Sequence, residues 1–480
     1  MAVCDDAAKR ELLALLPSDL HDKDVLEITL PLSTPLLSSS SARSLSVLEL
    51  TDAMVQEVTP TAFFSVMPEH LQNKQFDVVV FNRVLVFLSD AQAKVVAKRV
   101  LQLLRPEGVV VFRESCFQEP SPVKNSTCAS LKLTYRHPSF YVGCFGTAYV
   151  EGEVQGFSYL DFVGCKSLSV YRQAPAKTHG ELCFVYKKIA QPGDEEAVNS
   201  RGRSASEQMD SFQNFLDNQQ YSNASITRYE KIFGAGYVST GGQTTTTEFV
   251  AKLGLQRGQR VLDVGCGIGG GDFYMANTFG VSVLGIDLST NMVFRAMEQF
   301  PQSFNPPPVA DASIDAVLAD VEFEICDATS KHFAENSFDV IYSRDTILHI
   351  EGKEALFAQF LSWLKPGGKL LVSDYCCGDD KPPSQSFTNY VRQRGYSLLS
   401  PNQYGKLLER VGFTQVVAED RTAHFTEVLN EELERTKRNK ASFVQETSEA
   451  DFNAIVQGWE GKLKRCAEGD QKWGLFFAVK

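Results

Sequence analysis

The chain has 480 residues, with 47 Lys and Arg against 59 Asp and Glu and a formal net charge of -12 at pH 7. Its basic residues are scattered, so the charge pattern argues against a nucleic-acid partner. No stretch approaches the roughly 20 apolar residues of a membrane span, and the first residues lack a signal-peptide core, so we expect a cytoplasmic protein with no membrane span. This length predicts two domains, and we expect a monomer.

The 11 cysteines show no metal-ligand spacing. The closest pair, Cys376 and Cys377, is adjacent, which suits neither a zinc site nor a redox pair. We therefore expect reduced thiols and no metal.

The first half has the pattern of an α/β domain that has lost its nucleotide loop. A first strand is predicted from Val25, and it continues into 29–33 with Pro31 and no glycine. Side chains at that turn would block a nucleotide. Two further buried strands, from Phe76 and from Leu104, are separated by a predicted helix.

The segment after Lys187 turns polar and charged, which is typical of an exposed linker. We predict a degenerate, catalytically silent domain over 1–188, a linker over 189–210 and an active domain over 211–480.

Residues 261–271 are an apolar strand that ends in an acid and turns through five glycines. Gly265, Gly267 and Gly270 satisfy G-x-G-x-x-G, a pattern that opens a helix N-terminus to a nucleotide. Asp263, before the first glycine, stands where dinucleotide fingerprints usually have an apolar residue. The segment therefore favours S-adenosylmethionine over a dinucleotide; a structural glycine turn is the remaining alternative.

The two halves repeat each other. Strands from Phe338 and Leu364 echo those from Phe76 and Leu104, and the alternation of strand and helix predicts a Rossmann-like, doubly wound, mostly parallel sheet in each half. Pairing Phe76 with Phe338 without a gap places Arg83 on Asp345 and Phe87 on His349, so polar groups are missing from the first copy. The alternative is that the first half is an unrelated α/β domain.

Acids follow the predicted strands of the second half. Strand ends at Asp263, Asp287, Asp327 and Asp374 would meet at the carboxyl edge of the sheet, where open α/β sheets bind ligands. Asp287, about 20 residues past the glycine loop, is placed to bind ribose hydroxyls. Asp327 could read an adenine amino group or merely cap a helix.

Asp345 and His349 are four residues apart, so on a helical turn they would share one face. The histidine is either a base for an ammonium substrate or a satisfied core residue among Ile347, Leu348 and Ile350. Earlier in the chain, Ser222 is predicted to cap a helix ending at Gly234, as part of an arm that could close over the cofactor.

Several motifs together give a more specific likeness. They are 218–221 (Asn-Gln-Gln-Tyr), Tyr229, 238–242, the glycine loop, 343–345 with His349, and the ending 459–480. By these, residues 211–480 resemble the phosphoethanolamine N-methyltransferase family. The arrangement is similar to the two-domain nematode members, in which the C-terminal methyltransferase domain is the active one.

The resemblance implies an S-adenosylmethionine-dependent enzyme that converts phosphomonomethylethanolamine and phosphodimethylethanolamine to phosphocholine, for phosphatidylcholine biosynthesis. It implies Tyr221 and His349 as the catalytic pair. It implies cofactor binding by Ser239, Asp263, Gly265, Gly267, Asp287, Leu288, Asp327, Ala328 and Arg344. It implies phosphobase binding by Gln220, Tyr229, Asp345, Tyr375, Arg394, Tyr396 and Lys462.

Arg and Lys side chains together with tyrosine hydroxyl donors are suited to binding a phosphate group. Without the resemblance, Arg394 and Lys462 would be interpreted as solvated residues on a helix surface. Two other functions remain open: methylation of an unphosphorylated amine such as glycine or sarcosine, and adenosylmethionine binding by a non-catalytic scaffold. The sequence assigns no function to the proline-rich segment 301–313.

Overall fold

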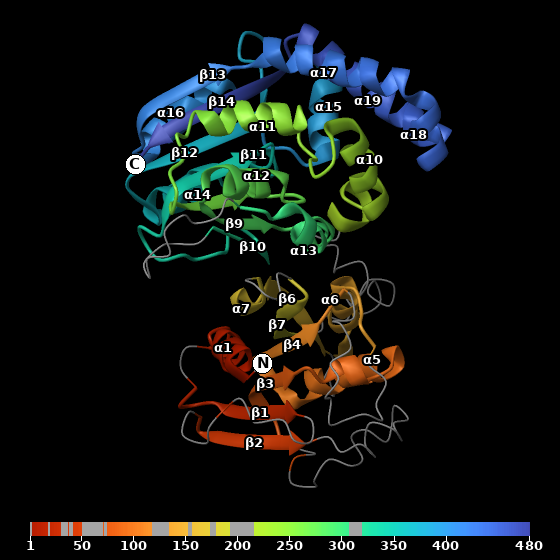
Figure 1. Cartoon of the computed structure of the whole chain (residues 1–480), viewed down its shortest axis with the longest axis vertical. Coiled ribbons are helices and arrows are strands. Elements are labelled where there is room, and N and C mark those ends of the chain that lie inside the picture. The colour runs from red at the N-terminus through yellow and green to blue at the C-terminus, as the bar shows by residue number, and fades with distance from the viewer. Residues whose placement is uncertain are drawn as a thin grey trace. The chain divides into compact units, whose positions relative to one another are not determined.

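The structure is a computed structural model that describes residues 2–17, 20–29, 37, 42–49, 71, 74–117, 134–151, 156–172, 179–192, 216–306 and 319–480. It divides into two compact units, Met1–Asn214 and Phe215–Lys480. In Figure 1 each unit is a set of strands flanked by helices. The predicted turn through Pro31, the linker beyond Pro192 and residues 307–313 of the proline-rich segment lie outside the described residues.

The N-terminal unit is a mixed sheet in the order β6-β7-β4-β3-β1-β2, with β5 paired to β6. Its strands are β1 (Asp24–Thr29), β2 (Ser44–Glu49), β3 (Phe76–Asn82), β4 (Leu104–Ser115), β5 (Tyr149–Glu151), β6 (Gly156–Ser167) and β7 (Glu181–Pro192). Its helices are α1 (Ala2–Leu13), η1 (Leu85–Phe87), α5 (Asp90–Leu103), α6 (Pro138–Gly146) and α7 (Ser169–Arg172). The first four strands are parallel, and β7 runs antiparallel to β4 and β6.

The C-terminal unit has the sheet order β13-β14-β12-β11-β8-β9-β10. Its strands are β8 (Arg260–Val264), β9 (Ser282–Asp287), β10 (Asp320–Ile325), β11 (Phe338–Arg344), β12 (Leu364–Cys377), β13 (Thr414–Asp420) and β14 (Gln471–Val479). The five strands from β8 to β12 are parallel, and β14 is antiparallel to both its neighbours. Because β8 lies between β9 and β11, the strand order reverses beside it, which is where doubly wound sheets bind ligands.

The helices of this unit begin with a π-helical turn over Leu216–Gln220. They continue with α10 (Asn223–Phe233), α11 (Gly242–Ala251), α12 (Gly270–Phe279), α13 (Thr290–Ser303), η3 (Ile347–His349), α14 (Lys353–Trp363), α15 (Gln385–Arg394), α16 (Pro401–Val411), α17 (Thr422–Arg438), α18 (Lys440–Glu446) and α19 (Glu449–Ala467). As predicted, Ser222 caps α10, with its side chain accepting the Ser225 N–H, and Gly234 ends it.

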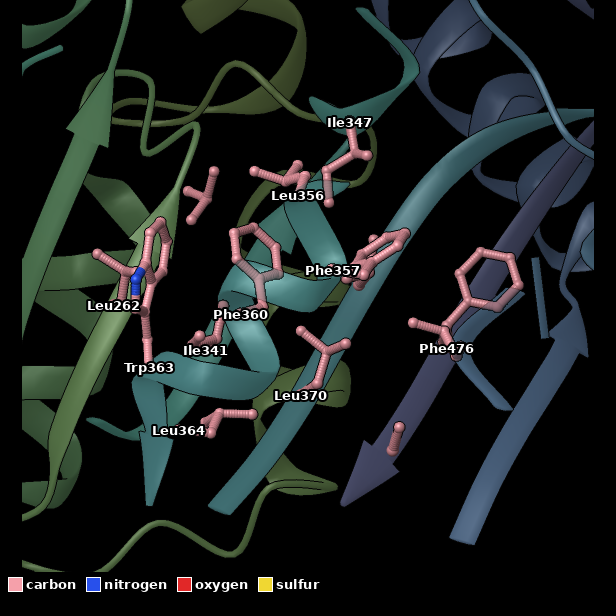
Figure 2. Close-up of a cluster of buried hydrophobic side chains, with 14 of the residues drawn as sticks. Leu262, Ile341, Ile347, Leu356, Phe357, Phe360, Trp363, Leu364, Leu370 and Phe476 are labelled. Atoms are coloured by element: carbon pink, nitrogen blue, oxygen red, sulfur yellow. The ribbon is translucent and has the colours of Figure 1, made fainter. Parts of the chain in front are cut away.

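A buried aromatic cluster holds α14 and α16 against the sheet. Figure 2 shows Phe357, Phe360 and Trp363 of α14 among sheet residues that include Leu370 and Phe476. Ile347, in the turn η3, belongs to the same cluster, so this turn is anchored in the core.

The two units share local geometry that confirms the pairing of Phe76 with Phe338. Strand β3 pairs with β4, and β11 with β12, in the same register with the same shift after the first residue. In both copies a glycine near the start of the second strand of this pair is crowded: a Cβ would lie 2.9 Å from a backbone oxygen at Gly108 and 2.8 Å from one at Gly368. The predicted α/β fold class is confirmed, whereas the antiparallel strands β7 and β14 were not foreseen.

Three local expectations differ from the structure. Strand β7 continues to Pro192, four residues into the predicted linker 189–210. Asp374 does not end its strand, because β12 runs on to Cys377. Asp345 and His349 do not share a helix: Asp345 has a left-handed backbone, with φ of 50°, and His349 ends a separate short 3-10 turn.

Candidate active site

The glycine loop joins β8 to α12 and is packed closely on both sides. Gly265 has φ of 83°, and a Cβ there would lie 2.0 Å from Thr346 Oγ1. A Cβ on Gly270 would lie 2.2 Å from the Gly236 carbonyl oxygen. The glycines are therefore required by the approach of the turn after β11 and of the segment after α10.

Asp287 braces this loop from the end of β9. Its Oδ2 accepts the Gly267 N–H at 3.0 Å, and its Oδ1 accepts the Ser289 N–H at 2.9 Å. Burial raises the pKa of Asp287 to about 6, and these backbone N–H groups oppose the rise. The Leu288 N–H also acts on this carboxylate, and its two oxygens can accept about four bonds, so the predicted contact with ribose hydroxyls is compatible with this geometry.

Asp263 is a buried carboxylate at the end of β8. Its Oδ1 has no hydrogen-bond partner among the described residues. Burial raises its pKa to about 8, while Arg344 acts in the opposite direction. A buried oxygen without a donor is costly, so this group fits a site that receives a ligand cation or donor.

Arg344, predicted to bind the cofactor, holds the backbone before and within α11. Its guanidinium donates to the Thr240 carbonyl oxygen at 2.8 Å, to Thr245 Oγ1 at 2.8 Å and to Thr246 Oγ1 at 2.6 Å. Ser239 lies in this segment and accepts the Gly242 N–H at its carbonyl. Arg344 therefore fixes the position of Ser239.

Of the remaining predicted cofactor residues, Asp327 is exposed and caps a turn. Its Oδ1 accepts the Thr329 N–H and hydroxyl, both at 2.8 Å. Leu288 and Ala328 follow the ends of β9 and β10, and the Cys326 N–H donates to the Asp287 carbonyl between them. The structure thus brings these three residues to one edge of the sheet, with Asp327 in the capping role that the sequence left open.

The arm that carries Gln220 and Tyr221 is tied to the start of α13. Asp217 accepts the Ser289 hydroxyl at 2.5 Å and the Thr290 hydroxyl at 2.6 Å. Asn291 Nδ2 donates to the Tyr221 carbonyl at 3.0 Å. The arm is therefore fastened beside Asp287, with the Gln220 amide donating to the Tyr221 hydroxyl at 3.0 Å.

Asp345 presents a buried carboxylate on a strained backbone. Its Oδ1 accepts Trp473 Nε1–H at 2.9 Å and the Ser373 hydroxyl at 3.3 Å. Its Oδ2 is buried and has no hydrogen-bond partner among the described residues. Asp345 has a left-handed backbone, a conformation that a non-glycine residue keeps only where neighbouring groups stabilise it. Here the Asp345 N–H donates to the Ser373 carbonyl at 2.8 Å.

His349 lies against the ring of Tyr396, with ring centroids 5.1 Å apart. Burial, then Lys353 and Arg394, lower its pKa to about 4. The imidazole is therefore neutral near pH 7 and able to accept a proton. Arg394 also influences Tyr221 and Tyr229, so one guanidinium lies within electrostatic reach of all three predicted site residues.

The predicted phosphate pocket gathers side chains from α10, β12, α15, the following loop and α19. Lys462 Nζ lies 3.3 Å from the Tyr375 hydroxyl and 4.1 Å from the Trp459 ring centroid. Burial lowers the pKa of Lys462 to about 8, against the attraction of Glu432 and Asp345. Lys462 is thus not solvated helix surface, and a bound dianion would raise its pKa again.

The structure adds residues that the sequence analysis missed. Trp473 and Ser373 orient Asp345. Glu432 accepts the Gly241 N–H and Trp459 Nε1–H, both at 2.8 Å, and so joins the cofactor segment to the phosphate pocket. The sequence signal for Glu432 was its spacing from Phe425, Leu429 and Leu433, which places it on the apolar face of α17. Trp473 carried no signal beyond its place in the C-terminal motif.

The corresponding place in the N-terminal unit has different chemistry. Arg83 shares the left-handed conformation of Asp345, with φ of 55°, and its N–H bonds the Arg113 carbonyl at 2.8 Å. Arg113 stands where Ser373 stands, and Glu181 opposite β4 occupies the register position of Trp473. Arg113 and Glu181 form a buried ion pair at 2.8 Å. Arg83 thus replaces the Asp345 carboxylate, and an ion pair replaces its two donors.

Within the ranges that the structure describes, no three His, Cys, Asp or Glu side chains are grouped to hold a metal ion. None of the described helices is long and apolar enough to cross a membrane.

Comparisons with known proteins identify the family of the chain. A family model described as "Methyltransferase domain" matches residues 242–419. The chain is 41% identical over 490 residues to phosphoethanolamine N-methyltransferase 1 of Triticum aestivum, covering 99% of this chain and 91% of that one. It is 45% identical over 404 residues to phosphoethanolamine N-methyltransferase 1 of Arabidopsis thaliana, covering 84% and 75%.

Among solved structures, the chain is similar to phosphoethanolamine N-methyltransferase 2 of Haemonchus contortus in complex with phosphomonomethylethanolamine and S-adenosylhomocysteine. The TM-score is 0.78 at 27% identity, and the match covers 99% of both chains. The likeness noted in the sequence is confirmed: the chain belongs to the phosphoethanolamine N-methyltransferase family of S-adenosylmethionine-dependent enzymes.

Proposed function

We propose that the C-terminal unit methylates phosphomonomethylethanolamine and phosphodimethylethanolamine to give phosphocholine. The observation that carries this proposal is the pairing of Asp345 with the pocket around Lys462. Asp345 offers a buried oxygen without a partner to an ammonium group, and Lys462 with Tyr375 offers donors to a phosphate. A phosphobase carries both groups a few bonds apart.

The glycine loop and its acids fit S-adenosylmethionine. Gly265 and Gly267 let Thr346 and Val238 pack directly on the loop, and Asp287 accepts the Gly267 N–H. Asp263 has an oxygen, without a partner among the described residues, for the amino acid end. We assign Ser239, Leu288, Asp327 and Ala328 to the same subsite. When bound, this donor supplies an electrophilic methyl group on a sulfonium.

The residues of this chain prepare the amine. The nitrogen attacks through its lone pair, so an ammonium substrate must first lose a proton, and neutral His349 is the group that accepts it. Asp345 then orients the amine and stabilises the charge that returns to nitrogen as the new C–N bond forms. Tyr221, held by Gln220, closes the arm over this site and completes the catalytic pair.

Two observations support the later methylations. The similar structure from Haemonchus contortus was solved with phosphomonomethylethanolamine. Each methylation also removes an N–H donor while the charge remains, so a carboxylate and aromatic rings suit the later substrates better than neutral hydrogen-bond acceptors.

We further propose that the N-terminal unit is catalytically silent. Arg83 replaces the Asp345 carboxylate, Phe87 replaces His349, and Arg113 with Glu181 forms a closed ion pair in the corresponding region. A cationic substrate would meet Arg83 instead of a carboxylate, which is unfavourable.

The test compares phosphodimethylethanolamine with dimethylethanolamine and with sarcosine, using the full chain and S-adenosylmethionine. Turnover that requires the phosphate is expected. Equal or better turnover of the unphosphorylated amines would overturn the proposal in favour of the small-amine alternative, and no turnover of any amine would favour the scaffold.

A further inference from the structure

The turn that carries His349 is held by two buried charged groups. Lys353 Nζ donates to the Ile347 carbonyl at 2.8 Å and to the Ile350 carbonyl at 2.6 Å, on either side of His349. Asp374 Oδ1 accepts the Leu348 N–H at 3.2 Å. Lys353 is 4% exposed and Asp374 is fully buried. We call these two residues the turn clamp.

The place of Lys353 is energetically unfavourable for a lysine. It is the first residue of α14, where the helix dipole disfavours a positive charge, and burial adds a desolvation penalty. Burial lowers the pKa of Lys353, and Asp374 acts in the opposite direction. The hydrogen bonds to the Ile347 and Ile350 carbonyls, together with the negative charge of Asp374, offset these costs. The Lys353 ammonium group is therefore stabilised in this position by the turn that it contacts.

The N-terminal unit builds the same clamp from a different part of the chain. Arg136 donates to the Leu85 carbonyl at 2.9 Å and also to the Leu88 carbonyl. When Phe76 is placed on Phe338, these carbonyls correspond to those of Ile347 and Ile350.

The carboxylate is repeated as well. Glu114, on the strand equivalent to β12, accepts the Leu85 N–H at 2.6 Å and the Val86 N–H at 3.2 Å. Both copies of this turn are therefore held by a buried cation and a buried acid. The first copy further shows that a guanidinium can replace the ammonium.

We propose that Lys353, together with Asp374, is a positioning residue for His349: it fixes the turn that aims the imidazole at the amine. This inference rests on the proposed function, in which His349 accepts the proton of the amine.

The electrostatic surroundings of His349 agree with this role. After burial, Lys353 is the next contribution that lowers the pKa of His349, ahead of Arg394. Tyr396, at 5.1 Å between ring centroids, also lies against the ring, and Asp374 accepts the Leu348 N–H of its turn. Loss of the Lys353 charge therefore raises the pKa of His349.

The experiment uses the full chain as wild type, K353M and K353R, with K365M as a control for the loss of one lysine charge at the surface. Histidine side chains are followed by NMR from about pH 3 to 8, a range that spans the His349 pKa of about 4, with H349Q assigning the signal. We expect the pKa of His349 to rise by about one unit in K353M and to remain at the wild-type position in K353R and K365M. An unchanged His349 titration in K353M would overturn the proposal.

A kinetic readout separates positioning from general stability. With phosphodimethylethanolamine, kcat of K353M should fall about tenfold at pH 7 and by a similar factor at pH 6, because His349 stays mostly neutral at both values and the loss comes from its position. The S-adenosylhomocysteine dissociation constant should stay within about twofold. K353R should recover most of kcat. An equal loss of kcat in K353R and K353M would contradict the positioning role, because Arg136 holds the equivalent turn of the N-terminal unit through a guanidinium group.

The two readouts also keep this inference distinct from the proposed function. If no phosphobase is turned over, the proposed function fails, yet the NMR titration still decides the electrostatic role of Lys353. If K353M does not fold, K353Q, which keeps one donor and loses the charge, takes its place with the same expected and contradicting results.

Discussion

Replacing Asp345 by Asn tests the amine-binding carboxylate with little change in shape. The Asn amide oxygen can keep the Trp473 bond now made by Oδ1 at 2.9 Å. Asn also adopts left-handed backbone readily, so φ of 50° at this position is not a new strain. The variant should therefore fold like the wild type.

The chemical change falls on the second oxygen. Oδ2, buried and without a partner among the described residues, becomes an NH₂ group that faces the substrate ammonium. Loss of one member of a buried charge pair costs about 2 to 5 kcal/mol, and 3 kcal/mol corresponds to about a 150-fold lower kcat/KM. Phosphodimethylethanolamine methylation, followed by mass, measures this loss, while calorimetry with S-adenosylhomocysteine measures cofactor binding.

Cofactor binding should change less than about twofold, because Asp345 is assigned to the amine. Ser373→Ala is the matched control: it removes the 3.3 Å bond to Oδ1 and leaves the carboxylate, so its loss should stay below about fivefold. A loss below about fivefold in Asp345→Asn, or an equal loss in both variants, would refute the assignment of Oδ2 to the ammonium.

Three further predictions concern other parts of the site. Unfolded histidine binds a proton below about pH 6.5, whereas folded His349 binds one only below about pH 4, so the unfolded state holds more protons between these values. As the pH falls from 6.5 to 4, the free energy of unfolding of the wild type should therefore drop by about 3 kcal/mol. Denaturant titration should show that His349→Gln lacks this drop. Lys462→Met should raise the phosphobase KM about 30-fold, whereas Lys464→Met on the same helix, whose side chain is 75% exposed, should leave KM unchanged; equal effects would reject the phosphate contact. Gly265→Ala should abolish S-adenosylhomocysteine binding in calorimetry, since its Cβ would meet Thr346 at 2.0 Å, while Gly458→Ala, with open space around its Cβ, should bind normally.

Features encoded by neighbouring residues were predictable from the sequence. The glycine loop, the strand that ends at Asp287 and the Ser222-capped helix each depend on residues a few positions apart, whose chemistry dictates the local turn or cap. The internal repeat was also readable, because buried strands and a turn containing Pro and Gly recur in the same order in both halves.

Features made by distant segments were not predictable. Trp473 reaches Asp345 because β14 returns antiparallel beside β12, and no local signal specifies that pairing. Asp345 and His349 were expected on one helical turn, but a left-handed residue interrupts the chain between β11 and the 3-10 turn. Asp374 was expected at the ligand edge, yet it is used inside the fold to hold the Leu348 N–H.

We expect the C-terminal unit alone to be active and to perform the later methylations. The most direct measurement incubates the purified chain with S-adenosylmethionine and, separately, phosphoethanolamine, its monomethyl form and its dimethyl form, with products followed by mass. We expect methylation of the monomethyl and dimethyl forms, ending at phosphocholine, and no methylation of phosphoethanolamine. Turnover of phosphoethanolamine would contradict the restriction to the later steps, and turnover of none of the three would contradict the proposed function itself.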